Sequence, residues 1–332
     1  MKATKLIDNN IIEFDWSLQI ENRASILTFC NEKILWEGGI CMLTGQAGKG
    51  KSNIVLAALS SAINQNCDSL GFKFATDKRY IYIDTENEKN TFIRNVRNTL
   101  QKRALLIEGD EIKNVSFVCL GGVDKIEKKK KIVFSLLDSD DYDVYIIDTV
   151  TDLIKNVNDV NEVVDFITKL CSSLFNKKKS VFLTIHGNPL GEAREKARGV
   201  LGSELLRKAS CSLLLKIDEE DRRCITTDFL LGKNRLGDDK LEQYFTKDED
   251  LNIFVSCNDA TPFSSKKSKE KEEKRIEKII EIIGDEKIKS KELVDIIKNE
   301  FNISQRSAYY LLSKAVKEGK INKDKNDYYY TL

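Results

Sequence analysis

Short apolar runs separated by longer, mixed segments recur along the first part of the chain. The runs are rich in Ile, Val, Tyr and Phe and show little alternation with polar residues, which is typical of strands buried on both faces of a sheet. Two of the intervening segments, 53–62 and 90–106, read as helices. Strands that alternate with helices predict an α/β fold with a mostly parallel sheet flanked by helices. The predicted buried strands are 40–44, 79–83, 115–120, 143–150 and 180–185.

Strand patterns also occur outside this series, at 11–16, 25–36, 212–217 and 224–230. The second of these contains a predicted hairpin turn at Asn31-Glu32. We expect the N-terminal strands, within residues 1–39, to pack on the main sheet. The last two read as a hairpin around a charged turn at 218–223, and residues 71–78 read as a loop.

The C-terminal part has a different pattern, beginning with a charged, low-complexity stretch that predicts a linker or an early helical turn. Beyond it, apolar residues recur at helical spacing, with Ser290 and Ser304 as helix caps and Gly319 as a helix stop. Residues 320–332 read as a two-stranded wing. The predicted parts of the chain are a first domain 1–262, a charged linker 263–274, and a small domain of three helices and a hairpin, 275–332.

The stretch after the first buried strand carries the clearest chemistry. Gly45, Gly50, Lys51 and Ser52 fit the pattern G-x-x-x-x-G-K-[ST] between a strand and a helix, and a chance match in a glycine-rich turn is the weaker alternative. Glycines let several backbone N–H groups turn toward one anion, and the helix dipole favours phosphate. Lys51 can reach the β- and γ-phosphates, and the Ser52 hydroxyl can ligate Mg²⁺. The predicted nucleotide-binding residues are Gly45, Gln46, Ala47, Gly48, Lys49, Gly50, Lys51 and Ser52.

Acidic residues end two other predicted strands. Asp84-Thr85-Glu86 follows the strand at 79–83, and Asp148 lies at the end of D-V-Y-I-I. In open parallel sheets the ligand lies beyond the carboxyl ends of the strands. We therefore expect Asp148 to hold Mg²⁺ through water, together with Ser52, and Asp84 or Glu86 to orient and deprotonate an attacking water. Spacing alone does not choose between these two acids, and an ordinary polar strand end is the alternative.

The single histidine, His186, follows the strand at 180–185 and is expected at the same edge. This position favours a contact with the γ-phosphate over a purely structural role. The loop 187–203 is glycine-rich and basic, which suits a contact with a nucleic-acid backbone, although a solvated surface loop is nearly as well supported. The run of four lysines at 128–131 favours a solvated helix face over a binding patch. The loop's candidate DNA-binding residues are Arg194, Lys196 and Arg198.

A second pair of cations follows the predicted hairpin. Lys233 and Arg235 flank one residue, and residues i and i+2 of a strand face the same side. The two side chains can therefore grip one anion together.

The order of these motifs resembles the RecA-like P-loop ATPases, over about residues 20 to 257. Within that superfamily the chain is most similar to the DnaB- and RepA-type hexameric helicase group. The resemblance implies that Glu86 is the catalytic carboxylate and that His186 replaces the usual phosphate-sensing residue, which is glutamine in DnaB-type proteins. It also implies that the basic loop faces DNA in a pore, and that Lys233 and Arg235 reach into a neighbouring subunit's ATP site. The sequence shows no primase-binding domain before the ATPase.

The C-terminal pattern of three short helices and a hairpin resembles a winged helix-turn-helix. The recognition helix would expose Arg306, Ser307, Tyr310 and Lys314, and DNA is favoured over protein as its partner.

Composition adds a few limits. The formal net charge is +1, so no global charge draws the protein to nucleic acid or membrane, although residues 266–332 hold 17 Lys and Arg against 13 Asp and Glu. The 8 cysteines include no C-x-x-C pair and predict neither a zinc site nor a disulfide framework. No apolar run reaches membrane-spanning length, so we expect a cytoplasmic protein with no membrane partner.

These observations predict an oligomeric motor on DNA that depends on ATP and Mg²⁺, of the replicative or mobile-element helicase type. The family resemblance implies a hexamer. The expected partners are single-stranded DNA in a ring or filament and duplex DNA at the winged helix. The alternative is an ATP-gated DNA-binding regulatory switch or a recombinase-like ATPase without unwinding activity. A P-loop kinase of small molecules is less favoured, because a pair of cations acting in trans requires a neighbouring subunit.

Overall fold

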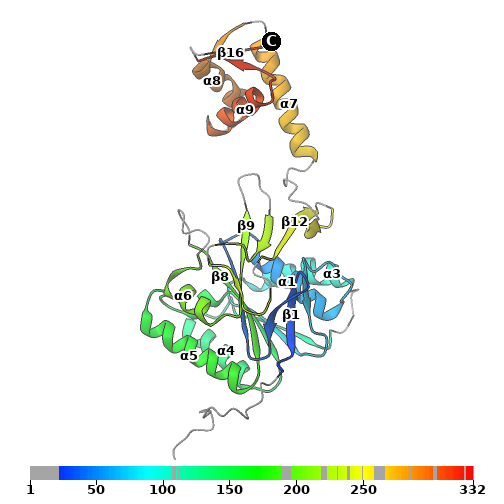
Figure 1. Ribbon diagram of the computed structural model, residues 1–332, viewed down its shortest axis with the longest axis vertical. Helices are drawn as coiled ribbons and strands as arrows, with labels where there is room; N and C mark the ends of the chain where they lie inside the picture. The colour runs from blue at the N-terminus through cyan, green and yellow to red at the C-terminus, as the bar shows by residue number, and fades with distance from the viewer. Residues whose placement is uncertain are drawn as a thin grey trace, which may run out of the picture. The chain divides into compact units, whose positions relative to one another are not determined.

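The computed structural model describes most of the chain and divides it into two compact units, Met1–Pro262 and Phe263–Leu332 (Figure 1). No helix among the described residues has both the length and the apolar composition needed to cross a membrane. The described residues are 22–106, 110, 112–188, 196–217, 223–229, 231–237, 240–248, 250–257, 266–284, 286–301, 305–324 and 327–331.

A large sheet forms the centre of the first unit, with the strand order β13-β12-β10-β9-β3-β8-β7-β5-β6 and β11 paired to β9. The strands from β9 to β6 in this order are parallel to one another, and β10 to β13 add antiparallel pairs at one side. The strands are β3 (Ile40–Gly45), β5 (Tyr80–Asp84), β6 (Val115–Cys119), β7 (Val144–Asp148), β8 (Ser180–His186), β9 (Cys211–Ile217), β10 (Arg223–Thr226), β11 (Lys233–Asn234), β12 (Glu242–Asp248) and β13 (Ile253–Cys257).

Helices cover both faces of this sheet, because each buried strand sends alternate side chains to opposite sides. In β3, Cys41 and Leu43 pack with α1 (Lys51–Ile63) in one core, whereas Ile40 and Met42 pack with α4, α5 and α6 in the other. The predicted fold class, a mostly parallel α/β sheet flanked by helices, is confirmed. The other helical segments are α2 (Lys89–Asn95), a π-helical turn (Val96–Gln101), α3 (Lys102–Ala104), α4 (Ile126–Asp138), a 3₁₀ turn (Val150–Leu153), α5 (Val160–Asn176) and α6 (Gly199–Lys208).

A small second sheet, in the order β2-β1-β4, contributes to the core that contains α1. Its hairpin turns at Cys30 and Asn31, which have positive φ angles of 50° and 67°, so the predicted turn was displaced by one residue. The third strand lies in the segment 71–78, which was wrongly expected to be a loop. Residues 11–16 lie outside the described residues. The strands are β1 (Ser25–Phe29), β2 (Glu32–Trp36) and β4 (Phe72–Phe74).

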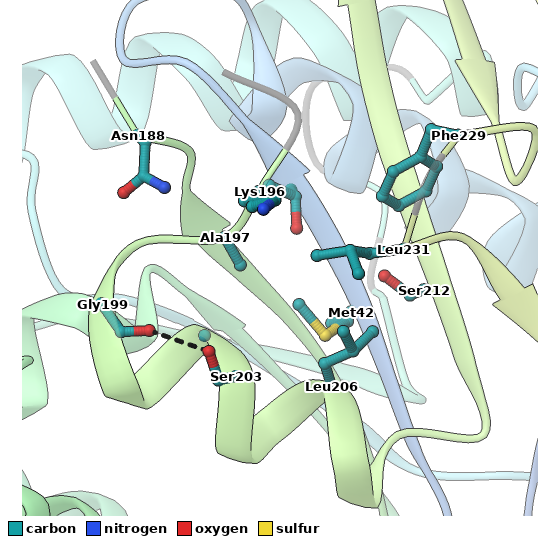
Figure 2. Close-up of a pocket in the computed structure, with 12 residues that line it drawn as sticks. Met42, Asn188, Lys196, Ala197, Gly199, Ser203, Leu206, Ser212, Phe229 and Leu231 are labelled. Carbon is teal, nitrogen blue, oxygen red and sulfur yellow. Dashed lines mark hydrogen bonds between the residues drawn. The ribbon is translucent and has the colours of Figure 1, made fainter. Parts of the chain in front are cut away.

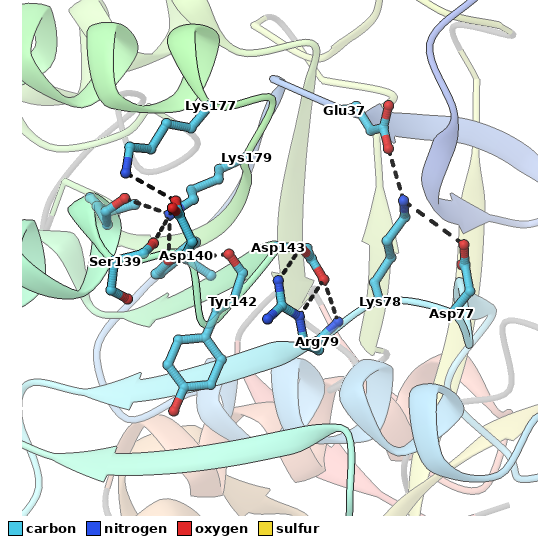
Figure 3. A network of polar contacts seen from close by, with 12 residues as sticks. Glu37, Asp77, Lys78, Arg79, Ser139, Asp140, Tyr142, Asp143, Lys177 and Lys179 are labelled. Carbon is cyan, nitrogen blue, oxygen red and sulfur yellow. Dashed lines mark hydrogen bonds and ion pairs between the residues drawn. The ribbon is translucent and has the colours of Figure 1, made fainter.

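A network of ion pairs fixes the amino ends of the central strands (Figure 3). Arg79, just before β5, makes two side-chain hydrogen bonds to Asp143, just before β7, at 3.2 and 3.0 Å. Lys179, just before β8, donates to the Leu137 carbonyl at 2.8 Å and lies 3.8 Å from Asp140. These contacts align the starts of three parallel strands, so that their carboxyl ends also come together.

The second unit contains three helices around one core, with a small sheet in the order β14-β16-β15. Its first helix begins at Lys266, so most of the stretch 263–274 takes the helical alternative and not that of a linker. Lys and Glu, which dominate that stretch, are good helix formers. The elements are α7 (Lys266–Ile283), β14 (Ile288–Lys289), α8 (Ser290–Phe301), α9 (Gln305–Lys317), β15 (Asn322–Lys323) and β16 (Tyr328–Tyr330).

Candidate active site

The loop between β3 and α1 forms a cradle of backbone N–H groups. Gly50 precedes the helix with φ of 100° and Gly48 has φ of 70°, a region that favours glycine. The first turn of α1 carries no acidic residue that would offset the positive end of its dipole. A loop of this shape at a helix N-terminus fits the phosphates of a nucleotide.

Lys51 lies inside this loop. Its Nζ donates to the carbonyls of Gly45 at 2.9 Å and Gln46 at 3.1 Å, and the residue is only 6% exposed. Burial lowers the pKa of Lys51, while the charges of Asp148 and Glu86 oppose that change. A cation held this way needs only a small movement of its end group to meet a phosphate oxygen.

The strand order brings the other predicted residues to the same edge. β8 lies between β3 and β7, and β5 follows β7. In this register Gly45 is opposite His186, and Asp148 is opposite Asp84. Because all four strands are parallel, their carboxyl ends meet where the phosphate cradle opens.

Asp148 is held by hydroxyl groups from both neighbouring strands. Tyr82 donates to its Oδ2 at 2.8 Å and Thr184 to its Oδ1 at 2.6 Å. Burial raises the pKa of Tyr82 well above its usual range, so its proton stays available for this bond. Sequence reasoning missed both hydroxyls, although Tyr82 lies two residues before Asp84 and therefore on the same face of β5. The Asp148–Thr149 peptide is cis.

The residues here fit a magnesium ion most of whose ligands are water molecules and phosphate oxygens. A carboxylate has about four acceptor positions, so Asp148 can still accept from a metal-bound water. No group of three or more acidic, His or Cys side chains that could hold a metal occurs among the described residues. Mg²⁺ characteristically keeps several waters and binds through one or two protein groups plus phosphates. Ser52 and Asp148 are two protein groups of this kind.

The structure separates the two candidate catalytic acids. Asp84, 1% exposed, accepts hydrogen bonds from the backbone N–H groups of Glu86 and Asn87 at 3.0 and 2.8 Å and from the Asn87 amide at 2.9 Å. Burial raises its pKa, and these bonds oppose that change. Asp84 therefore holds the turn after β5. The Glu86 side chain is 57% exposed and points its carboxylate toward the site, so the geometry favours Glu86.

His186 lies between the cradle and Glu86. Its Nδ1 is 3.1 Å from Lys51 Nζ, and its Nε2 is 3.7 Å from Glu86 Oε2. Because an ammonium group only donates, Nδ1 acts as the acceptor and Nε2 carries a proton toward Glu86. This polar contact with His186 is the main cause of a lowered pKa for Glu86, with Lys51 contributing. Glu86 is therefore ionised at neutral pH.

The basic loop is fixed at its base and is shorter than predicted. Arg198 N–H donates to the His186 carbonyl at 2.9 Å, and Asn188 N–H donates to the Lys196 carbonyl at 3.0 Å. Helix α6 begins at Gly199, so the prediction of loop as far as Ser203 was wrong; a helix of only 10 residues, with two glycines among its first four, gave little periodic signal. Lys196 and Arg198 are exposed at this base. Arg194 lies outside the described residues.

A cavity of about 230 Å³ lies beside this loop, bounded by β3, β9 and α6 (Figure 2). Lys196 and Asn188 line its rim, and Met42 and Leu206 line its interior. Thr44, the residue before Gly45, also lines it.

Lys233 and Arg235 bind the end of α6 within the same subunit. Lys233 donates to the Leu206 carbonyl, and Arg235 donates to the Arg207 carbonyl at 2.8 Å. Burial, together with the charge of Arg235, lowers the pKa of Lys233 to about 8. The two side chains face one side, as their alternation predicts, but here they meet the carbonyl end of a helix dipole.

Helix α9 of the second unit buries Ala308, Leu311 and Leu312 and exposes Tyr309. Lys314 is half-buried. Arg306, Ser307 and Tyr310 are part of this helix, and their side chains lie outside the described residues.

No protein-family profile and no curated protein sequence matches this chain. Among solved structures, the chain is similar to a KaiC-like protein of the archaeon Pyrococcus horikoshii. The TM-score is 0.44 at 14% sequence identity, over 67% of this chain and 90% of that protein. At these values the likeness assigns neither a family nor an activity.

Proposed function

We propose that the first unit is an ATPase. The observation that carries this proposal is the meeting of Lys51, Asp148, Glu86 and His186 at one edge of the sheet, next to a cradle of backbone N–H groups. The four residues come from α1, β7, β8 and the turn after β5, and the strand order β3-β8-β7-β5 brings these elements together. An ordinary glycine-rich turn would not explain the hydroxyl-supported carboxylate or the half-exposed acid beside the histidine.

The chemistry follows from these positions. The cradle and Lys51 bind the β- and γ-phosphates. Ser52 and Asp148 would hold Mg²⁺, which would supply positive charge to the phosphate oxygens. Glu86, ionised at neutral pH, orients a water and accepts its proton as that water attacks the γ-phosphorus, and the bond from the γ-phosphorus to the bridging oxygen breaks with ADP as the leaving group. The His186 Nε2 proton holds the Glu86 carboxylate in place.

Three substitutions test the proposal. Lys51→Ala should lose ATP binding or turnover, whereas Glu86→Gln should bind ATP and hydrolyse it orders of magnitude more slowly. Asp84→Asn is the matched control at the neighbouring acid: it should lower the unfolding free energy because the turn loses an anionic acceptor. Equal turnover by Glu86→Gln and the wild type would remove Glu86 from the mechanism.

We further propose that this ATPase is an oligomeric motor on DNA. Two features support this extension. Lys196 and Arg198 are exposed beside His186, so a backbone bound there would lie next to the phosphate site. The second unit has the element order α7-β14-α8-α9-β15-β16, which is that of a winged helix. An ATP-gated DNA-binding switch without unwinding activity is the alternative.

DNA binding is tested with a chain that ends at Pro262, compared with the full chain. The shortened protein should keep its basal ATPase rate and lose part of its duplex affinity, with a smaller dependence on salt. Unchanged duplex affinity at several salt concentrations would assign the second unit to a protein partner. Strand-displacement and ATPase assays with single-stranded DNA separate a motor from a switch.

The proposed oligomer would share its active site through Lys233 and Arg235. Within one subunit, their contacts with α6 hold both side chains in place. To reach a neighbouring subunit's phosphate, the two side chains would have to break their hydrogen bonds with the α6 carbonyls. Arg235→Ala should bind ATP and barely hydrolyse it, since such cations contribute about 10³–10⁵ in rate. Mixing it with Glu86→Gln should restore some activity. A monomer with maximal turnover would contradict this arrangement.

A further inference from the structure

One lysine of the run 128–131 lies inside the candidate active site. Lys129, in the first turn of α4, donates from Nζ to the Thr85 carbonyl at 2.7 Å. Thr85 is fully buried and joins the ends of two strands: its N–H donates to the Asp148 carbonyl at 2.8 Å, and its hydroxyl is bonded to the Thr149 backbone. Lys129 therefore supplies a hydrogen-bond donor to the Thr85 carbonyl, and Thr85 links the carboxyl ends of β5 and β7.

The neighbouring lysines point elsewhere. Lys130 pairs with Glu162 at 3.2 Å, while Lys128 and Lys131 are exposed. Because successive helical residues are rotated by about 100°, the residues that follow and precede Lys129 point away from the sheet edge. The solvated helix face predicted from the sequence therefore describes Lys128 and Lys131, and these two provide matched controls.

Lys129 also lies among the site's carboxylates. Its charge lowers the pKa of Glu86, after the larger effects of His186 and Lys51, and it opposes the rise that burial causes in the pKa of Asp152. Asp152 lies in the 3₁₀ turn after β7, and the negative charge of Glu86 also raises the pKa of Asp152. The two acids are close enough to interact, and the charge of Lys129, like that of His186, acts on both.

We propose that Lys129 is a positioning residue: its hydrogen bond to Thr85 fixes the backbone from which Glu86 projects toward His186. The consequence for hydrolysis rests on the proposed ATPase function, whereas the consequence for the Glu86–His186 contact does not. Without Lys129 the buried Thr85 carbonyl loses a charged donor, which is costly enough for the backbone to shift and seek water. Glu86, the next residue, would move with it.

The first test needs no turnover. His186 is the only histidine, so its imidazole gives one C2–H signal in protein labelled with ¹³C-histidine. Glu86→Gln removes the charge beside the ring and shows how far the signal moves when the contact is lost. Lys129→Met is expected to move the signal in the same direction, and Lys128→Met should leave it in place. A wild-type signal in Lys129→Met would overturn the proposal.

The second test measures hydrolysis. Lys129→Met should lower kcat about ten- to a hundredfold, because small displacements of a catalytic group have effects of that size, with the KM for ATP unchanged. Lys129→Arg should recover part of kcat, and Lys131→Met should match the wild type. A change in KM with kcat preserved would contradict the positioning role. If the wild type hydrolyses no ATP but the His186 signal moves as expected, the ATPase proposal fails and the positioning role stands.

Discussion

Replacing Gly50 by alanine should destabilise the first unit more than replacing Gly48, although both glycines have positive φ. An L residue in that region costs about 1–2 kcal/mol at either position. An added Cβ at Gly48 would meet nothing within 4 Å, whereas at Gly50 it would lie 2.8 Å from Phe254 Cε2. The difference between the two substitutions therefore measures a contact between the phosphate loop and β13.

The Phe254 ring has little room to retreat. It is 7% exposed, and it packs against Phe245 with ring centroids 5.1 Å apart. The Arg103 guanidinium also binds the Phe254 carbonyl, which fixes the strand. Overpacking a filled core costs about 1–3 kcal/mol, so Gly50→Ala should cost about 2–5 kcal/mol and Gly48→Ala about 1–2 kcal/mol.

Urea unfolding followed by tryptophan fluorescence suits this comparison, since both tryptophans, Trp16 and Trp36, belong to the first unit. Combining Gly50→Ala with Phe254→Leu should recover the overpacking part, giving a favourable coupling of about 1–3 kcal/mol. Gly50→Ala should also lose nucleotide affinity, because the loop must move. Equal costs at the two glycines, or a coupling within about 0.5 kcal/mol of zero, would refute the reasoning.

Two further predictions concern the acids of the site. Tyr82→Phe should lower turnover and raise the Mg²⁺ concentration needed for it, because Asp148 loses one of its two hydroxyl donors; an unchanged Mg²⁺ dependence would argue against that support. His186→Asn should shift the acid limb of the rate profile to higher pH, because the contact that lowers the pKa of Glu86 is lost and Glu86 then protonates at a higher pH. An acid limb in the same place would exclude His186 as the cause of that lowered pKa.

Elements with strong local patterns were predictable, and weak edge elements were not. The apolar runs of β3, β5, β7 and β8 gave the sheet its core, because a strand buried on both faces must be apolar throughout. β12 and β13 went unpredicted, since β12 is mostly half-exposed and its sequence mixes charges with aromatics. Because β13 was not predicted, the position of Phe254 beside Gly50 was not predicted either. No local pattern relates Phe254 to a glycine loop about two hundred residues earlier.

The sequence by itself located the glycine loop before α1 and the acidic strand ends, because these motifs depend on neighbours along the chain. Spacing did not choose between Glu86 and Asp84, and the family resemblance implied Glu86. The physical reason came from tertiary structure, where three hydrogen bonds assign Asp84 to a turn. The roles of Tyr82 and Lys129 likewise depend on strand order and helix rotation. Contacts of this kind join residues far apart in sequence, and their geometry follows from packing that spacing does not encode.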